Sequence, residues 1–200
     1  KIYGLLLVLL SSTHLYAQET FPINTTSNNN HTMYAFINAT IVVNEEQQIS
    51  NGTLLIKDGL IVSAGAAVKL PEGAVIYDLK GKFIYPGLID SYTTYGIPEP
   101  KRVSTGPGPQ LLTSAKGAYG WNQAVKPETE AIRMFTSDAK FAEEMRGLGF
   151  GSVLTFQKDG IVRGAAAVVT LGDTRENELI IKDRAAAMYS FDKGTSTQDY

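Results

Sequence analysis

Residues 33–85 contain a close succession of short β-forming segments separated by turn residues, and this pattern constrains the fold most strongly. The runs 53–57 and 60–63 meet across Asp58-Gly59. Such a two-residue connection predicts a hairpin, because both turn residues can adopt positive φ. Asn51-Gly52 predicts a further turn. Additional strands are expected at 34–37, 40–43, 74–79 and 82–85. Short strands with frequent turns predict a small sandwich or barrel.

After Pro86 the pattern changes from all-β to mixed. Residues 88–90 have the composition of a buried strand that ends in a polar group. Residues 96–125 are rich in Gly, Pro, Ser and Thr, and a connection of this length is typical of a functional or mobile loop. Pro127 then begins a short helical segment that we expect to reach Phe135, since proline suits a first helical turn.

The clearest helix signal covers residues 137–148. Ser137 is expected to be its N-cap and Gly149 its left-handed C-terminal cap. An apolar strand at 152–156 follows directly, so helix, glycine turn and strand predict half of a βαβ unit. Further strands are expected at 165–171 and 178–182.

The N-terminal residues predict export. Lys1 precedes an apolar run at 5–10, and small residues lead to a plausible cleavage point before Gln18, so 1–18 is expected to be a signal peptide. The run is much shorter than the ~20 apolar residues that span a bilayer, which argues against a stable membrane anchor. Residues 19–32 are polar and predict a flexible leader. We therefore expect a periplasmic or secreted protein.

The composition restricts the kinds of partner and catalytic or metal site that we expect. The 200 residues carry a formal charge of −2 and include no cysteine. The nearly balanced charge gives no reason to expect a nucleic-acid partner, and thiolate metal sites and cysteine nucleophiles are excluded. His14 and His31 are the only histidines. Both precede the first predicted strand, so we expect no histidine cluster in the folded part.

One segment resembles a known family. In residues 85–94, Pro86-Gly87 followed by Leu88-Ile89-Asp90 is similar to the signature P-G-(L/F)-I-D-x-H-x-H of the amidohydrolase superfamily. Tyr92 and Thr94 stand where the signature has its two histidines. Segments 51–65, 70–74 and 78–90 resemble, in the same order, the sandwich that precedes the barrel in that family, and 119–200 resemble a secreted bacterial, imidazolonepropionase-like branch.

The resemblance implies mixed β and α/β architecture: a small β-sandwich at 33–85, then the start of an incomplete (β/α)₈ TIM-type barrel at 86–200. Such a barrel needs ~250 residues, so we expect an N-terminal fragment of a longer protein. The family also implies metal-activated water that hydrolyses non-peptide carbon–nitrogen bonds. Any Zn²⁺ or similar divalent metal would then be held by ligands beyond Tyr200, and the catalytic residues are not identified.

Four residues are candidates for substrate binding. Tyr92 and Thr94 keep the alternation that points both side chains to one face, but they are poor zinc ligands. They can line a pocket or fill the space of a lost metal. Tyr95 can stack on a ligand together with Tyr92, or pack in the core or rim. Arg163 can face a carboxylate substrate, or be an ordinary exposed loop arginine. Asp90 can support the site or cap nearby backbone N–H groups.

Two functions are compatible with the sequence. The first is a metal-dependent hydrolase of non-peptide carbon–nitrogen bonds in a small-molecule substrate, with a degenerate first metal motif. The second is a non-catalytic homologue that binds a ligand or a homologous partner subunit. A third, unrelated hypothesis is that the chain is a surface-exposed β-rich binding module. The segments that resemble the amidohydrolase family, in the same order along the chain, argue against this hypothesis.

Overall fold

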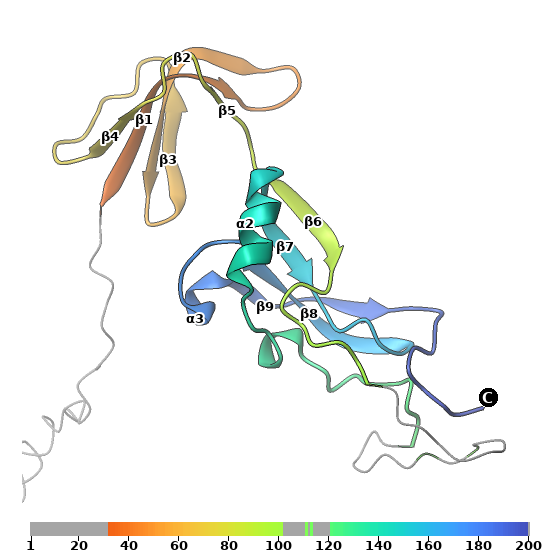
Figure 1. The fold of residues 1–200 in the computed structure, drawn as a ribbon. Helices are drawn as coiled ribbons and strands as arrows, with labels where there is room; N and C mark the ends of the chain where they lie inside the picture. Colours follow the sequence, from red (N-terminus) through yellow and green to blue (C-terminus); the bar gives the residue numbers. More distant parts are fainter. Residues whose placement is uncertain (1–31, 102–110, 112, 114–120, 200) are drawn as a thin grey trace, which may run out of the picture. The chain divides into compact units, whose positions relative to one another are not determined.

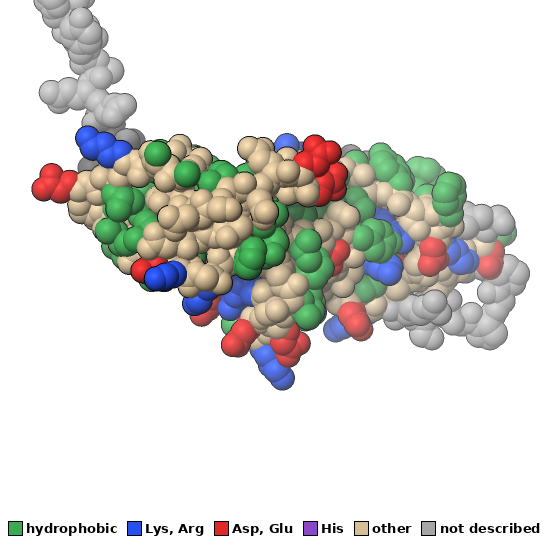
Figure 2. Space-filling model, turned by 90° about the horizontal axis from the view of Figure 1, so that it is seen from above, with side chains coloured by type: hydrophobic (Ala, Val, Ile, Leu, Met, Phe, Trp, Pro, Cys, Tyr) green, Lys and Arg blue, Asp and Glu red, His purple; other side chains and the backbone are tan. Residues whose placement is uncertain are grey.

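The computed structural model describes residues 32–101, 111, 113 and 121–199 (Figure 1). They form two compact units that divide between Ile84 and Tyr85. The predicted signal peptide, nearly all of the predicted leader and much of the Gly/Pro-rich loop lie outside the described residues. Within the described part, no helix is both long and apolar enough to cross a membrane. On the face drawn in Figure 2, acidic and basic side chains are interspersed.

The first unit contains a five-stranded sheet. The strand order is β3-β2-β1-β4, and β5 also pairs with β1. β1 and β3 are antiparallel to β2, whereas β4 and β5 run parallel to β1. The strands are β1 (Met33–Val42), β2 (Gln48–Lys57), β3 (Leu60–Gly65), β4 (Val75–Asp78) and β5 (Phe83–Ile84). The β-rich prediction is confirmed, but residues 32–84 show one sheet and not the two packed sheets of a sandwich.

The connection between β2 and β3 is the predicted hairpin. Asp58 and Gly59 have φ of 52° and 76°, which is the backbone that an Asp-Gly hairpin turn requires. The flanking residues Lys57 and Leu60 pair directly across it. The Asp58-Gly59 pair is therefore sufficient to predict this hairpin from the sequence.

The predicted turn at Asn51-Gly52 is wrong, because both residues lie inside β2. Asn51 has a φ of 51°, and Gly52 pairs with Ala39 at an irregularity in the ladder. A Cβ on Gly52 would lie 2.8 Å from the Ile41 Cδ1 atom. The glycine thus permits close packing between β1 and β2, and the asparagine tolerates the left-handed backbone of a bulge. The two runs predicted at 34–37 and 40–43 likewise form a single irregular strand, β1.

The second unit contains a four-stranded sheet in the order β6-β7-β8-β9. β6 and β7 are parallel, and the other two pairs are antiparallel. Its elements are β6 (Leu88–Thr93), η1 (Ala131–Arg133), α2 (Ala139–Gly147), β7 (Phe150–Thr155), β8 (Val162–Thr170), α3 (Glu176–Leu179) and β9 (Ile180–Tyr189). The β6, α2, β7 order confirms the predicted βαβ pattern. After β7, however, the chain turns back as an antiparallel meander, so a started barrel is not confirmed.

Helix α2 forms where the sequence predicts it, with one correction. Its N-cap is Asp138 and not Ser137, since Asp138 Oδ1 accepts a hydrogen bond from the Phe141 backbone N at 3.0 Å. Ser137 N instead donates to Glu176 Oε1 at 3.0 Å. Gly149 ends the helix region with a φ of 95°, as predicted for a left-handed cap.

Two other expected elements differ from the structure. The helical segment expected between Pro127 and Phe135 is reduced to η1, because Glu130 makes an extended parallel bridge to Ala165. The strand expected at 178–182 begins instead as the short helix α3, and β9 starts at Ile180. Glu130 and Ile180 both pair with residues of β8, and a local sequence window cannot contain such distant pairing.

The core of the second unit lies where α2, η1 and the loop after β6 pack against the sheet. Val153, Ala167 and Val169 of the sheet are fully buried, as are Ala131 of η1 and Ala142 of α2. The remaining buried members of this cluster are Tyr95, Ile97, Phe135, Leu171 and Leu179. This packing fixes the carboxyl ends of β6 and β7 next to each other.

Candidate functional site

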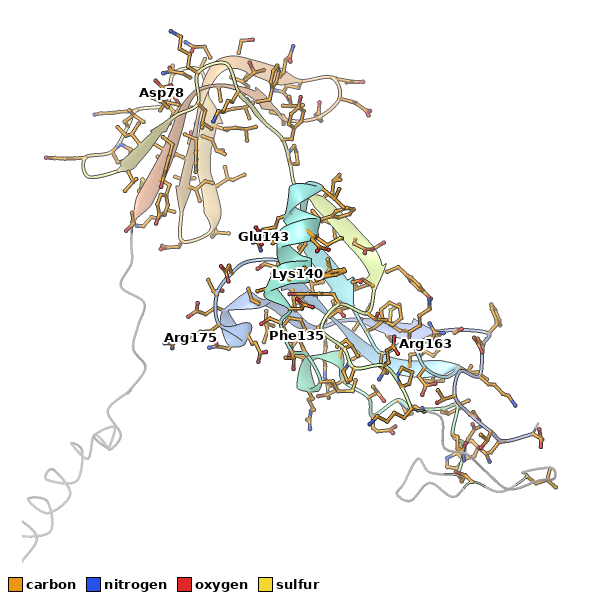
Figure 3. The ribbon with its side chains drawn as sticks, in the orientation of Figure 1. Asp78, Phe135, Lys140, Glu143, Arg163 and Arg175 are labelled. Carbon is orange, nitrogen blue, oxygen red and sulfur yellow. The ribbon has the colours of Figure 1, made fainter. Side chains whose placement is uncertain are left out.

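The carboxyl ends of β6 and β7 bring together aromatic and basic side chains. Tyr92 lies near the end of β6, and Phe156 directly follows β7. Arg163, which is labelled in Figure 3, is near the start of β8. The Tyr92 and Phe156 rings meet edge to face, with centroids 5.0 Å apart. The Arg163 guanidinium carbon lies 5.9 Å from the Phe156 ring. Residues 71 positions apart in sequence thus form one cluster.

Arg163 is anchored in this cluster by two hydrogen bonds. Its Nε donates to the Gly160 carbonyl at 3.0 Å, and its Nη1 donates to the Tyr92 hydroxyl at 3.2 Å. The residue is only 4% exposed, so it is not an ordinary exposed loop arginine. Lys158 adds a second positive charge, with its Nζ 5.2 Å from the centroid of the Tyr92 ring. Tyr92 itself is 54% exposed.

Next to this cluster, Asp159 forms a partly buried ion pair with Lys126, in which only the carboxylate is buried. Its carboxylate also accepts hydrogen bonds from Thr195, from the backbone N at 2.6 Å and from Oγ1 at 2.9 Å. Burial raises the pKa of the Asp159 carboxyl, but the bonds from Lys126 and Thr195 outweigh that effect and leave the pKa below its usual value. Asp159 therefore fastens the segment after β9 to the β7–β8 loop. Sequence reasoning missed this pair, since its members are 33 residues apart.

Tyr95 lies in the core and not in the Tyr92 cluster. It is 5% exposed, and its ring stacks on Phe141 at 5.3 Å and meets Phe135 edge to face at 5.7 Å. Its hydroxyl donates to the Asp138 carbonyl and accepts from the Asp138 backbone N, both at 3.3 Å. Burial is the main reason that the pKa of the Tyr95 phenol is raised. These contacts support the alternative in which Tyr95 packs in the core.

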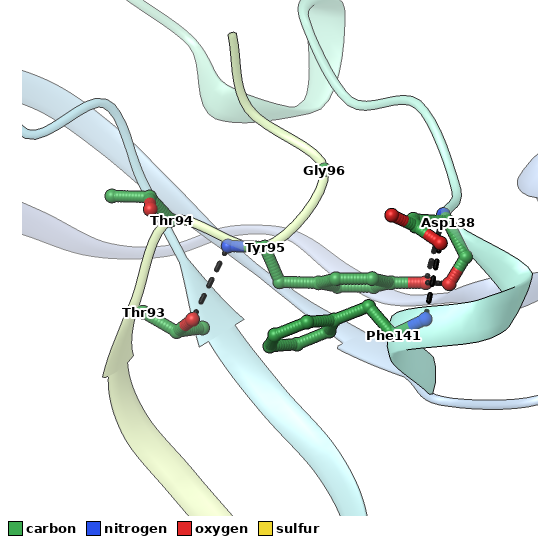
Figure 4. A pocket seen from close by; sticks show the side chains of 6 residues that line it. All are labelled: Thr93, Thr94, Tyr95, Gly96, Asp138 and Phe141. Carbon is green, nitrogen blue, oxygen red and sulfur yellow. Dashed lines mark hydrogen bonds between the residues drawn. The ribbon is translucent and has the colours of Figure 1, made fainter. Parts of the chain in front are cut away.

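Thr94 is exposed and borders a separate hollow. The hollow has a volume of about 220 Å³ and is lined by Thr93, Thr94, Tyr95, Gly96, Asp138 and Phe141 (Figure 4). The structure thus brings Tyr92 and Arg163 together, and it places Thr94 and Tyr95 at the hollow beside the start of α2. Substrate binding by these four residues stays a prediction.

The described residues do not fit a metal ion of the kind that the family resemblance implies. The Tyr92 hydroxyl accepts a hydrogen bond from Arg163, and Thr94 borders the hollow beside the start of α2, which Tyr92 does not line. In the part of the chain that the structure describes, no group of three or more His, Cys, Asp or Glu side chains could hold a metal. Asp90 uses Oδ1 to accept a hydrogen bond from the Tyr92 backbone N at 2.9 Å. This contact is the backbone-capping alternative considered for Asp90.

Comparison with solved structures shows an amidohydrolase-like fold. The similar structures include the crystal structure of an amidohydrolase from Thermotoga maritima MSB8, with 26% sequence identity and a TM-score of 0.55. The alignment covers 81% of this chain and 40% of that chain. This protein therefore spans less than half the length of the structure it resembles. No protein-family model and no curated protein matches the chain.

Proposed function

We propose that this chain belongs to an amidohydrolase-type protein that hydrolyses a non-peptide carbon–nitrogen bond in a small molecule. The observation that carries the proposal is the likeness to the Thermotoga maritima amidohydrolase over 81% of this chain. The Tyr92–Arg163 cluster supports it, because it lies at the carboxyl ends of two parallel strands. Barrel enzymes carry their active sites at that end of the strands.

In this proposal the described residues bind and orient the substrate. Arg163 and Lys158 offer positive charge to one side of the exposed Tyr92 ring. Metal activation of water would need ligands outside the described residues, so no catalytic step is assigned to this part of the chain. Export likewise remains a proposal that rests on residues 1–18.

A specific observation favours a second candidate, a non-catalytic homologue that binds a small ligand or a homologous subunit. Tyr92 stands where the signature has its first histidine, and its hydroxyl is already bound to Arg163. A phenol hydrogen-bonded to a guanidinium is a poor site for a second cation, since like charges repel at short distance. The contact therefore suits an anionic ligand better than a metal ion.

The test uses the full-length protein purified from metal-supplemented cells. The hydrolase proposal expects stoichiometric bound metal, and turnover of at least one class among cyclic amides, ureides and N-acyl amino acids that a chelator abolishes. It also expects Tyr92→Phe to lower kcat/KM, whereas Tyr189→Phe, at an exposed tyrosine of β9, leaves it unchanged. Absence of both metal and turnover would rule out the hydrolase and leave the binding role.

A further inference from the structure

We propose that Arg163, Lys158 and Tyr92 form a binding site for an oxyanion, the carboxylate or phosphate group of a small molecule. The inference rests on the proposed function and deepens it by naming the ligand chemistry. It is carried by two cations around one exposed aromatic ring that have no carboxylate partner in the part of the chain the structure describes, and one of them is almost fully buried.

Arg163 keeps binding capacity that the protein does not use. Its Nε and Nη1 atoms bind Gly160 and Tyr92, while Nη2 has no acceptor among the described residues. No carboxylate in the described part of the chain lies within 4.0 Å of the guanidinium. All fully buried side-chain nitrogens there have partners, so Nη2 must reach the surface. A buried charge without a counter-ion is costly, and an incoming anion removes that cost.

Lys158 and Tyr92 complete the site from the solvent side. The Lys158 ammonium lies 5.2 Å from the Tyr92 ring centroid and has no ion-pair partner among the described residues. The nearest acidic side chain along the chain, Asp159, is already paired with Lys126 and bonded to Thr195. Its charge is therefore largely offset, so among the described residues Lys158 and Arg163 are two cations beside Tyr92 that have no carboxylate partner.

The geometry selects an oxyanion over other ligands. A guanidinium is a planar fork that matches two oxygens of one carboxylate or phosphate group, whereas an ammonium is a movable point charge. Arg163 is held by Gly160 and Tyr92 and is therefore preorganised, which lowers the entropic cost of binding. Lys158 is exposed and free to move towards the same anion. A fixed fork and a mobile cation are complementary parts of an anion site.

The experiment is isothermal titration calorimetry of the full chain at low salt. The titrants are succinate, inorganic phosphate and, as a non-specific control, chloride. We expect succinate or phosphate to bind in saturable fashion at concentrations up to about 10 mM. Arg163→Lys keeps the charge but loses the fork, and we expect it to weaken binding about tenfold or more. Lys158→Gln should weaken binding about three- to tenfold, and added salt should also weaken it.

The matched control is Lys140→Gln, because Lys140 is an exposed lysine on α2, apart from Arg163 (Figure 3). It should leave affinity within about twofold of the wild type. Binding of succinate alone or phosphate alone assigns the source of the anion. The proposal is overturned if neither binds, or if Lys158→Gln and Lys140→Gln have the same effect. Hydrolysis is measured separately, so anion binding without turnover would contradict only the proposed reaction.

Discussion

Asp159→Asn tests whether the partly buried ion pair between Asp159 and Lys126 stabilises the second unit. The change keeps the shape of the side chain and removes its charge. An amide oxygen can still accept from the Thr195 backbone N, but the amide NH₂ is a donor that cannot replace a carboxylate beside Lys126. The variant should therefore lose the ion pair and part of the attachment of the segment after β9.

The expected loss of unfolding free energy follows from burial. Removing one partner of a fully buried ion pair costs about 3–5 kcal/mol. Asp159 is only 3% exposed, but the Lys126 side chain is 29% exposed. Its ammonium can return to water, so we expect a smaller loss of about 2 kcal/mol at pH 7.

The loss should depend on pH in a defined direction. The pKa of the Asp159 carboxyl is lowered in the folded state, so its stabilisation is fully present above the unfolded pKa of about 3.9. It disappears as the pH falls through the folded pKa. The difference between wild type and Asp159→Asn should therefore be constant from neutral pH down to about pH 5 and shrink below about pH 4.

Urea unfolding, followed by the fluorescence of Trp121 and by circular dichroism, measures both effects. Trp121 is the only tryptophan, and its carbonyl accepts from Gln198 Nε2 at 3.3 Å in the same region as the ion pair. Glu143→Gln, at an exposed acidic residue of α2, is the matched control and should change stability by less than about 0.5 kcal/mol. A loss equal to this control, or one independent of pH, would refute the reasoning.

Three further substitutions test two side-chain or backbone contacts and one turn conformation. Gly164→Ala places a Cβ against the Thr129 carbonyl at a φ of 78°, and thermal unfolding should show a loss of at least about 2 kcal/mol. Tyr95→Phe removes the hydroxyl bonded to Asp138, and urea unfolding should show a loss of about 1 kcal/mol. Gly59→Val forces a β-branched residue to a φ of 76°; circular dichroism should show the first unit destabilised by about 1–2 kcal/mol. A neutral result would contradict the corresponding contact at Gly164 or Tyr95, or the backbone restriction at Gly59.

Sequence reasoning succeeds where the physical cause is local. The Asp58-Gly59 hairpin depends on the backbone freedom of two adjacent residues, and α2 depends on its apolar face and on the glycine that follows it. The error at the helix N-terminus has a local cause and a distant cause. Ser137 and Asp138 are both good caps, and Glu176, which binds the Ser137 backbone N, belongs to a distant segment.

The candidate site is harder to predict because its contacts join distant segments. Arg163 is preceded by the turn-like sequence Asp159-Gly160, which suggests an exposed loop. Its burial follows from contacts with Tyr92 and Phe156. The parallel pairing of β4 and β5 with β1, and the antiparallel return after β7, likewise depend on partners elsewhere in the chain. Tyr92 was identified from its place in the motif, and its hydrogen-bond partner only from the structure.

The hydrogen bond between Tyr92 and Arg163 also limits how this site can change over generations. A histidine at position 92 loses the phenolic oxygen that receives the Arg163 Nη1 proton. A cation bound to that histidine would then face a buried guanidinium of the same sign. Arg163 would have to change as well, yet losing it first leaves Tyr92 without its partner. A change at position 92 alone is therefore unfavourable as long as Arg163 keeps its buried position.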